Sequence, residues 1–415
     1  MILLPPSKSI AARYLVASFF SGTLPGDPLF EDNDDLMVLQ SALLEVYSDE
    51  EPIDYGDSPI DCGESGTALR FLTAVCASSP GADYVITGSP RLMQRPMLPL
   101  LKVLREVGAH IETLGDNETG PYRVGGNRLK GGNFSIRGDI SSQFISALML
   151  AAPYWQEGMN LSFSTPLVSQ PYINMTARLM ESFKAKVKLT DSFVEVKPGK
   201  YEVAKDFKVE ADWSSAAFFM EACALSGSPL EIEKLTPPDS SLQGDSAAAG
   251  IFSKIGVVTS FDDDATRLKY DPSIALREVE IDFKETPDLV LPVAVGCLLT
   301  GVKFRFTNVA HLRFKESDRI LSLVNESAKI GFVIKSDDNT LEWQGERVEP
   351  QKSPLIKTYD DHRVAMAFAM TVFKTGEIRI EHPEVVEKSF IDFWNQLAKL
   401  GVSLHQEGEI MIVKK

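Results

Sequence analysis

Two carboxylates stand where they could transfer protons. Asp288 follows Thr286 and a proline at the start of an apolar segment. There we expect Thr286 to cap a helix and the helix dipole to keep Asp288 ionised, so that it can act as a base. Glu316 lies in the segment KESDR beside Lys315 and Arg319, so its protonation should respond to any anion that those cations bind. The pair predicts acid–base chemistry on a charged substrate.

Basic residues accompany these and other polar clusters in a chain that is acidic as a whole. The formal net charge is −16, so a broad cationic face for nucleic acid is not expected, and any anion must be bound by local clusters. Arginine suits two-pronged contacts with carboxylate or phosphate, and lysine supplies a mobile charge. Two members have plainer interpretations: Arg95 as a solvated surface residue and Arg319 as an i,i+3 ion pair with Glu316. The cations are Lys8, Arg13, Arg70, Arg95, Lys315, Arg319, Arg363 and Lys388.

The sequence predicts neither a metal site nor a nucleotide fingerprint. Its four cysteines are scattered without C-x-x-C spacing, which favours small core residues over a disulfide framework or a zinc site. His362, in DDHR, is interpreted as a capping or core histidine, and no other histidine has ligand spacing. The motifs G-x-x-x-x-G-K-[ST] and G-x-G-x-x-G are absent, which argues against a nucleotide hydrolase or a dinucleotide-dependent dehydrogenase.

Helix N-termini are the elements that must position these groups. Polar clusters precede apolar, small-residue runs in CGESGTALRFLTAV, ISSQFISALMLAA, ADWSSAAFFMEACAL, ETPDLVLPVAVGCLL, KESDRILSLV and TYDDHRVAMAFAM. The free N–H groups at such a terminus and the positive end of the dipole favour anions. Simple N-capping by Ser, Thr or Asp is the alternative, but caps need acceptors and do not explain the cations.

A joint of helix, small or basic residue and β-branched strand recurs about every 70 residues. The joints lie near Tyr47, Gly108, Lys186, Gly256, Gly331 and Gly401. Six α/β units fit the length, in two domains of about 200 residues, although any α/β protein shows such joints. A composition shift at residues 201–215 marks the expected crossover between the domains.

The sequence also bears on location. The N-terminal MILLPPSKS lacks the regions of a secretory signal. The apolar run at 289–302 is interrupted by Pro292 and is too short to span a membrane. We therefore expect a cytoplasmic protein.

Nine motifs in order along nearly the whole chain resemble the 3-phosphoshikimate 1-carboxyvinyltransferase (EPSP synthase) family of enolpyruvyl transferases. They are SKSIAAR, ESGTALR, PRLMQRP, SSQF, SQPY, the Asp288 helix, KESDR, DDHR and EKSF. The resemblance implies an α/β, two-domain, inverse α/β barrel-like fold of six βαβαββ-type units, three per domain. It also implies a discontinuous C-terminal-type domain of residues 1–7 and 211–415, an N-terminal-type domain of residues 8–210, and an active site in the cleft between them.

By this resemblance the reaction transfers the enolpyruvyl group of phosphoenolpyruvate to the 5-hydroxyl of shikimate 3-phosphate and releases phosphate. No cofactor and no metal are implied, and the partners are the two small-molecule substrates, without nucleic acid or membrane. A monomer is expected. Closure of the domains on the substrates is a further hypothesis, because it would exclude water and align the reactants.

Residue roles follow from the matched motifs. Asp288, Glu316 and Lys8 are the implied catalytic residues: Asp288 accepts the hydroxyl proton, and Glu316 with Lys8 manages the proton at the methylene carbon. The implied shikimate 3-phosphate residues are Lys8, Ser9, Arg13, Ser141, Ser142, Gln143, Ser169, Tyr172, Asp288, His311 and Lys315. The implied phosphoenolpyruvate residues are Lys8, Gly66, Arg95, Gln143, Arg319, Arg363 and Lys388.

Several positions depart from the family pattern. Glu64 stands where asparagine is common, and it either pairs with a nearby cation or weakens phosphoenolpyruvate binding. Ala11 and Ala12 replace usually polar residues, and His311 stands where asparagine is frequent. The first unit, between Arg13 and Cys62, is short and is predicted to lack a strand pair.

Two alternatives stay open at the level of sequence. One is the sister enolpyruvyl transferase that acts on UDP-N-acetylglucosamine, but that family carries a cysteine in the loop ahead of Arg95, and TGSPRLMQRP has none. The other is a non-catalytic paralogue that binds phosphorylated metabolites. Pure binding would not require Asp288 and Glu316 in an anion site.

Overall fold

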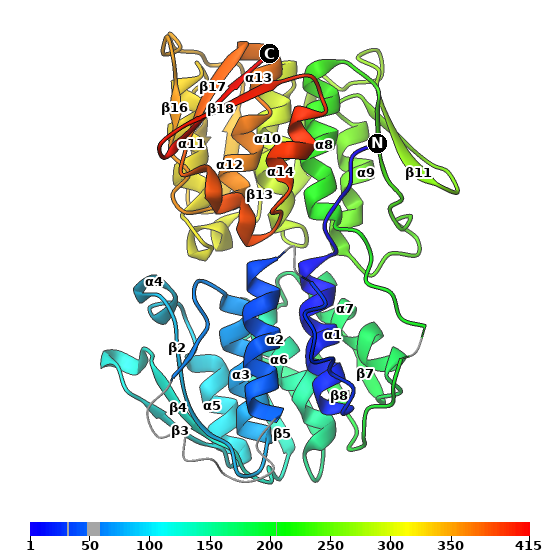
Figure 1. Cartoon of the computed structure of the whole chain (residues 1–415), viewed down its shortest axis with the longest axis vertical. Coiled ribbons are helices and arrows are strands. Elements are labelled where there is room, and N and C mark those ends of the chain that lie inside the picture. The colour runs from blue at the N-terminus through cyan, green and yellow to red at the C-terminus, as the bar shows by residue number, and fades with distance from the viewer. Residues whose placement is uncertain (31–32, 48–58, 205) are drawn as a thin grey trace. The chain divides into compact units, whose positions relative to one another are not determined.

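The chain folds into two compact units. The computed structural model describes residues 1–30, 33–47, 59–204 and 206–415 (Figure 1). Unit 1 comprises Met1–Ser7 and Glu210–Lys415, and unit 2 comprises Lys8–Val209. The chain thus passes between the units at residues 7–8 and 209–210. The second position lies one residue before the domain limit of 210–211 that the family resemblance implied.

Unit 2 contains two four-stranded sheets, with strand orders β1-β2-β4-β3 and β5-β6-β8-β7. Its helices are α1 (Lys8–Phe20), α2 (Asp34–Tyr47), α3 (Gly66–Ser78), α4 (Pro90–Met93), α5 (Leu98–Val107), α6 (Ser142–Ala151) and α7 (Gln170–Ser182), with short 3₁₀ turns η1 (Asp116–Glu118) and η2 (Ala152–Tyr154). Its strands are β1 (Ile60–Asp61), β2 (Asp83–Thr87), β3 (His110–Thr113), β4 (Tyr122–Gly125), β5 (Gly132–Ile136), β6 (Met159–Phe163), β7 (Val187–Leu189) and β8 (Phe193–Val196).

Unit 1 contains sheets of order β10-β11-β9, β12-β13-β15-β14 and β16-β17-β19-β18. Its helices are α8 (Trp213–Ser226), α9 (Ala248–Ser253), α10 (Val290–Thr300), α11 (Arg319–Lys329), α12 (His362–Ala369), α13 (Val372–Thr375) and α14 (Phe393–Ala398), with η3 (Gly244–Ala247), η4 (Pro287–Leu289), η5 (Ala310–Phe314) and η6 (Pro383–Lys388). Its strands are β9 (Leu230–Glu233), β10 (Val257–Phe261), β11 (Ala265–Tyr270), β12 (Glu278–Asp282), β13 (Lys303–Thr307), β14 (Lys335–Ser336), β15 (Thr340–Trp343), β16 (Leu355–Ile356), β17 (Glu377–Glu381), β18 (Ser403–Glu407) and β19 (Ile410–Lys414).

The sheets repeat one βαβαββ pattern, as the family resemblance implied. In each four-stranded sheet the first two strands pair in parallel, and the last two complete the sheet as antiparallel neighbours. The three-stranded sheet gains a parallel bridge from Ile2 to Ile232, so the N-terminal segment takes the place of the missing first strand. The remaining unit contributes α1 and α2, and the region expected to lack a strand pair includes residues 48–58, outside the described residues.

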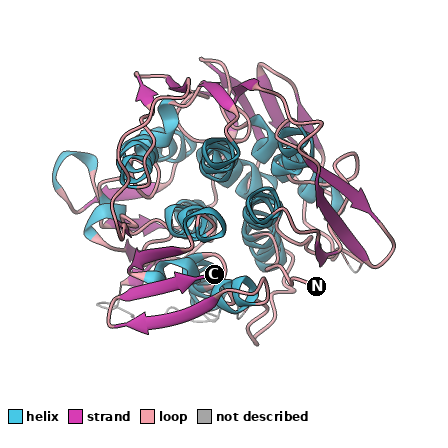
Figure 2. Ribbon diagram, turned by 90° about the horizontal axis from the view of Figure 1, so that it is seen from above, coloured by secondary structure: helices cyan, strands magenta, loops and turns pink. Residues whose placement is uncertain are grey.

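Helices lie inside and strands outside (Figure 2). In unit 1, α8, α10 and α12 contact one another, and in unit 2, α1, α3 and α6 do so. These inner helices are apolar on nearly all sides; in α8 every residue from Trp213 to Leu225 is buried. A helix without a polar face must be enclosed by other elements, so the outer helices and sheets surround it. The inner helices begin at or just after the polar clusters that the sequence singled out.

The predicted joints are present where the chain is described. Gly108 ends α5 with a φ of 110° before β3. The joint expected near Lys186 turns two residues earlier, at Lys184, which adopts a φ of 66° between α7 and β7. The joints at residues 256, 331 and 401 likewise follow α9, α11 and α14 and precede strands. After Tyr47 the chain enters residues 48–58, so the faintest joint lies outside the described part. Within that described part, no helix combines the length and apolarity needed to cross a membrane.

Candidate active site

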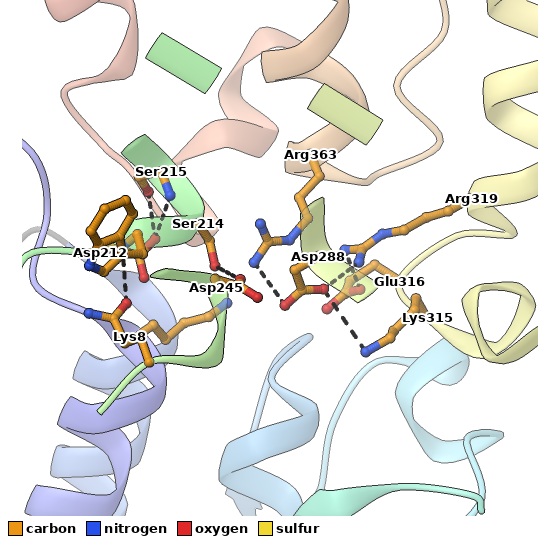
Figure 3. A network of polar contacts seen from close by, with 12 residues as sticks. Lys8, Asp212, Ser214, Ser215, Asp245, Asp288, Lys315, Glu316, Arg319 and Arg363 are labelled. Carbon is orange, nitrogen blue, oxygen red and sulfur yellow. Dashed lines mark hydrogen bonds and ion pairs between the residues drawn. The ribbon is translucent and has the colours of Figure 1, made fainter. Parts of the chain in front are cut away.

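Arg319 joins three carboxylates at the start of α11. Its Nε donates to Asp361 Oδ2 at 2.8 Å. Its Nη1 donates to Asp288 Oδ1 at 2.9 Å and its Nη2 to Glu316 Oε2 at 2.8 Å (Figure 3). The Arg319 side chain is 2% exposed. The i,i+3 pair with Glu316 considered from the sequence therefore exists, but it is one of three ion pairs on a buried guanidinium. Such a guanidinium is stable only because it is fully paired.

Asp288 is held ionised by cations. Arg363 Nη2 donates to Asp288 Oδ2 at 3.1 Å, Arg319 Nη1 donates to Oδ1, and Lys315 Nζ lies 4.0 Å from Oδ1. Burial alone would raise the pKa of Asp288, but Arg363, Lys315 and Arg319 together hold it well below its usual range. The expected cap is wrong in detail: Thr286 precedes the 3₁₀ turn η4 and makes no side-chain capping bond.

Glu316 is the most accessible acid of the network. Its side chain is 30% exposed, against 16% for Asp288 and 0% for Asp361. Lys315, on the same loop, is 28% exposed. A ligand can therefore reach Glu316 and Lys315 without the network being taken apart, whereas Asp361 serves only to hold other groups.

Asp361 links the start of α12 to the network. Its Oδ1 accepts the Arg363 backbone N–H at 3.0 Å, which caps the helix, and its Oδ2 accepts Ser317 Oγ at 2.9 Å. Burial would raise the pKa of Asp361, but the neighbouring Arg319 lowers it. Lys388, the lysine of EKSF, donates to the Asp360 carbonyl at 2.9 Å.

Two further groups surround this network in unit 1. His311 lies on η5, and burial, with Lys315 and Arg319, lowers its pKa to about 4 despite Asp288, so the ring is neutral at pH 7. Asp245 on η3 accepts a hydrogen bond from Ser214 Oγ, and its buried Oδ1 has no partner among the described residues. Burial and the charge of Asp288 raise the pKa of Asp245 to about 7.

In unit 2, Arg13 ties together α1, α6 and α7. Its guanidinium donates to Ser9 O at 2.7 Å, Thr176 Oγ1 at 2.7 Å, Ser146 Oγ at 3.1 Å and Tyr172 O at 3.3 Å. All four acceptors are neutral, and burial lowers the pKa of Arg13 to about 10. Arg13 thus fixes the backbone beside Ser9 and Tyr172.

Gly66, the first residue of α3, is flanked by two guanidiniums. A Cβ at this position would lie 2.6 Å from Arg70 Nη1 and 2.7 Å from Arg95 Nη1. Arg70 Nη1 donates to Gly66 O at 3.1 Å and to Gln143 Oε1, and Gln143 Nε2 donates to Thr67 Oγ1 at 3.0 Å. The Nε of Arg95 is buried without a partner in the described chain. The cluster of Gly66, Arg70, Arg95 and Gln143 is therefore suited to an anion.

The other expected residues of unit 2 lie at helix starts. Ser141 caps α6 by accepting the Gln143 N–H at 3.3 Å, and Ser142 follows it. Ser169 precedes α7 with a φ of 54° and is buried. Lys8, the first residue of α1, forms an ion pair with Asp35 Oδ2 at 3.0 Å.

Comparison with known proteins places the chain in a family. Residues 2–397 match the family profile described as EPSP synthase (3-phosphoshikimate 1-carboxyvinyltransferase). A 3-phosphoshikimate 1-carboxyvinyltransferase of Bacteroides fragilis is 40% identical over 408 residues, which is 97% of this chain and 95% of that protein. One from Vibrio cholerae is 31% identical over 420 residues, 96% of each chain. The chain belongs to the EPSP synthase family.

Solved structures agree on the fold of the family. The alignment with an EPSP synthase structure from Acinetobacter baumannii covers 99% of this chain and 97% of the other chain, with a TM-score of 0.72 and 23% sequence identity. A second structure of EPSP synthase from that organism has a TM-score of 0.69 and 22% identity. The family fold expected from the sequence is confirmed.

Within unit 1 the structure joins most of the residues expected from the EPSP synthase resemblance in one network. It contains Asp288, Lys315, Glu316, Arg319 and Arg363. Sequence reasoning missed Asp361 as a part of it and Asp245 as a buried acid under the electrostatic influence of Asp288, and in unit 2 it did not assign Arg70 to a site. The DD of DDHR marked a helix start and could have identified Asp361, whereas Asp245 carried no local signal.

Glu64, the departure from the EPSP synthase pattern, is exposed and has no ion pair within the described residues. The first of the two interpretations, pairing with a nearby cation, is therefore not what the structure has. Likewise, no set of three His, Cys, Asp or Glu side chains arranged for a metal ion is found in residues 1–30, 33–47, 59–204 and 206–415.

Proposed function

We propose that this chain transfers the enolpyruvyl group of phosphoenolpyruvate to the 5-hydroxyl of shikimate 3-phosphate and releases phosphate. The observation that carries the proposal is the Arg319 network. It brings an ionised base, Asp288, and an accessible acid, Glu316, together with Lys315 and Arg363. Two carboxylates among cations suit a reaction that moves protons on anionic substrates.

The chemistry divides between the two acids. Glu316, with Lys8, delivers a proton to the C3 methylene of phosphoenolpyruvate, which leaves C2 electrophilic. Asp288 takes the proton of the 5-hydroxyl as its oxygen adds to C2, which gives a tetrahedral adduct. The Glu316 carboxylate then removes a proton from C3 as the C2–O bond to phosphate breaks. The products are the enolpyruvyl ether and inorganic phosphate, and no cofactor is needed.

Substrate binding would also tune Asp288. Arg363 and Lys315 contact its carboxylate in the free protein and hold its pKa low, so it is then a weak base. A substrate anion that competes for these cations weakens their hold on Asp288. Its basicity therefore rises when both reactants are bound, which couples binding to proton transfer.

The anion clusters divide between the substrates. For phosphoenolpyruvate we assign Arg319, Arg363 and Lys388 in unit 1, and Gly66, Arg95 and Gln143 in unit 2, with Arg70 as their support. For shikimate 3-phosphate we assign Lys8, Ser9, Ser141, Ser142, Gln143, Ser169, Tyr172, Asp288, His311 and Lys315, with Arg13 holding Ser9 and Tyr172 in place. The two units then act on one pair of substrates.

Three accompanying predictions come from the sequence: the domain limits of 1–7 with 211–415 and of 8–210, a cytoplasmic location and a monomer. Size-exclusion chromatography with light scattering would test the last. A mass of two chains at assay concentration would contradict it.

The function is tested by phosphate release in the presence of a metal chelator. We expect phosphate from phosphoenolpyruvate only when shikimate 3-phosphate is present, with one phosphate per enolpyruvyl ether. UDP-N-acetylglucosamine in its place should give none. Release with the UDP-sugar alone would indicate the sister enzyme, and binding without release would indicate the non-catalytic paralogue.

A further inference from the structure

The turn that precedes α12 has an unfavourable backbone conformation. Tyr359 and Asp360 are the central residues of a β-turn closed by a hydrogen bond from Asp361 N to Thr358 O at 3.0 Å. Their φ angles are 55° and 57°, both in the left-handed region. Glycine, asparagine and aspartate are the usual residues of such turns, whereas tyrosine is not. A strained residue persists only where its surroundings hold it, and such residues gather at functional sites.

A buried carboxylate of α11 holds this turn. Glu326 has 0% exposure, and its Oε1 accepts the Tyr359 hydroxyl at 2.8 Å. Its Oε2 accepts the Lys357 backbone N–H at 3.0 Å and forms an ion pair with Lys329 Nζ at 2.7 Å. The tyrosine ring thus acts as a tether from the strained residue to the helix, and the acid is paired on both oxygens.

The same helix also holds the other end of the turn. Arg319, the first residue of α11, binds Asp361 through its Nε at 2.8 Å. Arg319 and Glu326 are seven residues apart, which is close to two turns of helix and places them on one face. Helix α11 therefore fixes the turn at Tyr359 and at Asp361 together.

The conformation of the turn determines the positions of two cationic residues, Arg363 and Lys388. Asp361 caps α12 through the Arg363 N–H at 3.0 Å, so the turn fixes where that helix and the Arg363 side chain begin. The carbonyl of Asp360 accepts Lys388 Nζ at 2.9 Å. We propose that Glu326 and Tyr359 are positioning residues that hold this turn in its left-handed form, and that they thereby orient Arg363 and Lys388 for phosphoenolpyruvate. The inference rests on the proposed assignment of these two cations.

The decisive experiment compares two substitutions of Tyr359 by steady-state kinetics. Tyr359→Phe keeps the ring and the strain but removes the tether, so KM for phosphoenolpyruvate should rise about fivefold, with KM for shikimate 3-phosphate unchanged. Tyr359→Asn removes the tether but also relieves the strain, because asparagine tolerates the left-handed region. It should stay within about twofold of the unmodified protein. If the ring served only for packing, the order of the two variants would be reversed.

Matched controls separate this effect from general damage. Tyr270 lies in the same unit, and its hydroxyl makes no hydrogen bond within the described residues. Tyr270→Phe should therefore change neither KM. Glu326→Leu removes the acceptors of both the Lys357 N–H and the Tyr359 hydroxyl, so it should raise the same KM as Tyr359→Phe. Glu221→Gln alters another buried carboxyl of unit 1 and should leave KM unchanged. Thermal melts establish that each variant is folded.

The outcomes distinguish the inference from the function on which it rests. If Arg363→Gln raises KM for phosphoenolpyruvate but Tyr359→Phe does not, the positioning role is wrong and the assignment of Arg363 stands. If Tyr359→Asn is more impaired than Tyr359→Phe, the positioning role is likewise overturned. If Arg363→Gln leaves that KM unchanged, the assignment itself fails, and the inference fails with it.

Discussion

At the level of single residues, the cations of the candidate site in unit 1 already form ion pairs with acidic side chains in the free protein. Arg319 is buried against three acids, and Arg363 and Lys315 both lie against Asp288. Arg13 and Arg70, in contrast, donate to neutral oxygens of serine, threonine, glutamine and the backbone.

Gly66 gives a prediction at this scale. In Gly66→Ala the new methyl group would overlap the ends of Arg70 and Arg95, which are flexible side chains, so the fold should persist while the guanidiniums move. We expect KM for phosphoenolpyruvate to rise about tenfold or more, because charge-assisted hydrogen bonds are lost. Steady-state kinetics at saturating shikimate 3-phosphate measures it.

The control for this substitution is Gly199→Ala. A Cβ at Gly199 meets nothing within 4 Å, and its φ is outside the left-handed region. This variant should be indistinguishable from the unmodified protein. An unchanged KM in Gly66→Ala would remove Arg70 and Arg95 from the phosphoenolpyruvate site.

Individual residues also show what the sequence could and could not predict. The KESDR segment predicted that Lys315, Glu316 and Arg319 act together, because all three lie within five residues. Asp361 joins the network through Arg319, which is 42 residues away in the sequence, and Asp245 accepts a hydrogen bond from Ser214, which is 31 residues away. Periodicity and motif spacing carry no information about such pairs, and neither acid was predicted.

At the level of elements, the inner helices explain both the fold and the position of the site. Their apolar composition predicted buried helices, and the polar clusters before them predicted the N-termini of those helices. The plainer interpretation, N-capping, also holds at Ser65, Ser141, Asp212, Asp318 and Asp361. It is wrong for Thr286, which precedes the 3₁₀ turn that begins at Pro287 and makes no capping hydrogen bond with its side chain.

Helix α8 carries an unusual buried acid that leads to a stability prediction. Glu221 is 0% exposed, and neither carboxylate oxygen has a partner in the described chain. Burial raises the pKa of Glu221 well above 4.5, so the group is neutral when folded and ionises on unfolding. Its favourable contribution is complete below pH 4.5 and is lost as the pH rises towards the folded pKa.

Glu221→Gln should therefore gain stability relative to the unmodified protein as the pH rises. The difference in unfolding free energy between pH 5 and pH 7 should change by about 2 kcal/mol in favour of the variant. Urea titrations of both proteins at the two pH values measure this change. A pH-independent difference would show that Glu221 ionises normally in the folded protein.

At the scale of the whole molecule, the sequence predicted six α/β units. Within the described residues, five of the six predicted joints have a helix, a turn and a strand in that order. Composition could not reveal that the N-terminal residues complete a sheet with β9, since a parallel bridge from Ile2 to Ile232 joins segments 230 residues apart. The family resemblance did predict this connection, because it implied that residues 1–7 belong to the same domain as residues 211–415. The spacing of motifs alone did not predict it.

The proposed assignment of substrate-binding residues to both units gives a prediction for the whole chain. We expect the radius of gyration from small-angle X-ray scattering to fall when phosphoenolpyruvate and shikimate 3-phosphate are both present, because ligands that bind to both units favour closure. Inorganic phosphate alone serves as the control. Identical scattering with and without the substrates would count against closure.

The central claim is that Asp288 and Glu316 move the protons of enolpyruvyl transfer while the surrounding cations bind the anions. Single-turnover phosphate release by Asp288→Asn and Glu316→Gln, with substrate affinity measured by calorimetry on the same samples, tests it most directly. The account predicts that each variant binds shikimate 3-phosphate and releases phosphate about a hundredfold to ten-thousandfold more slowly. Turnover at the unmodified rate in either variant would contradict it.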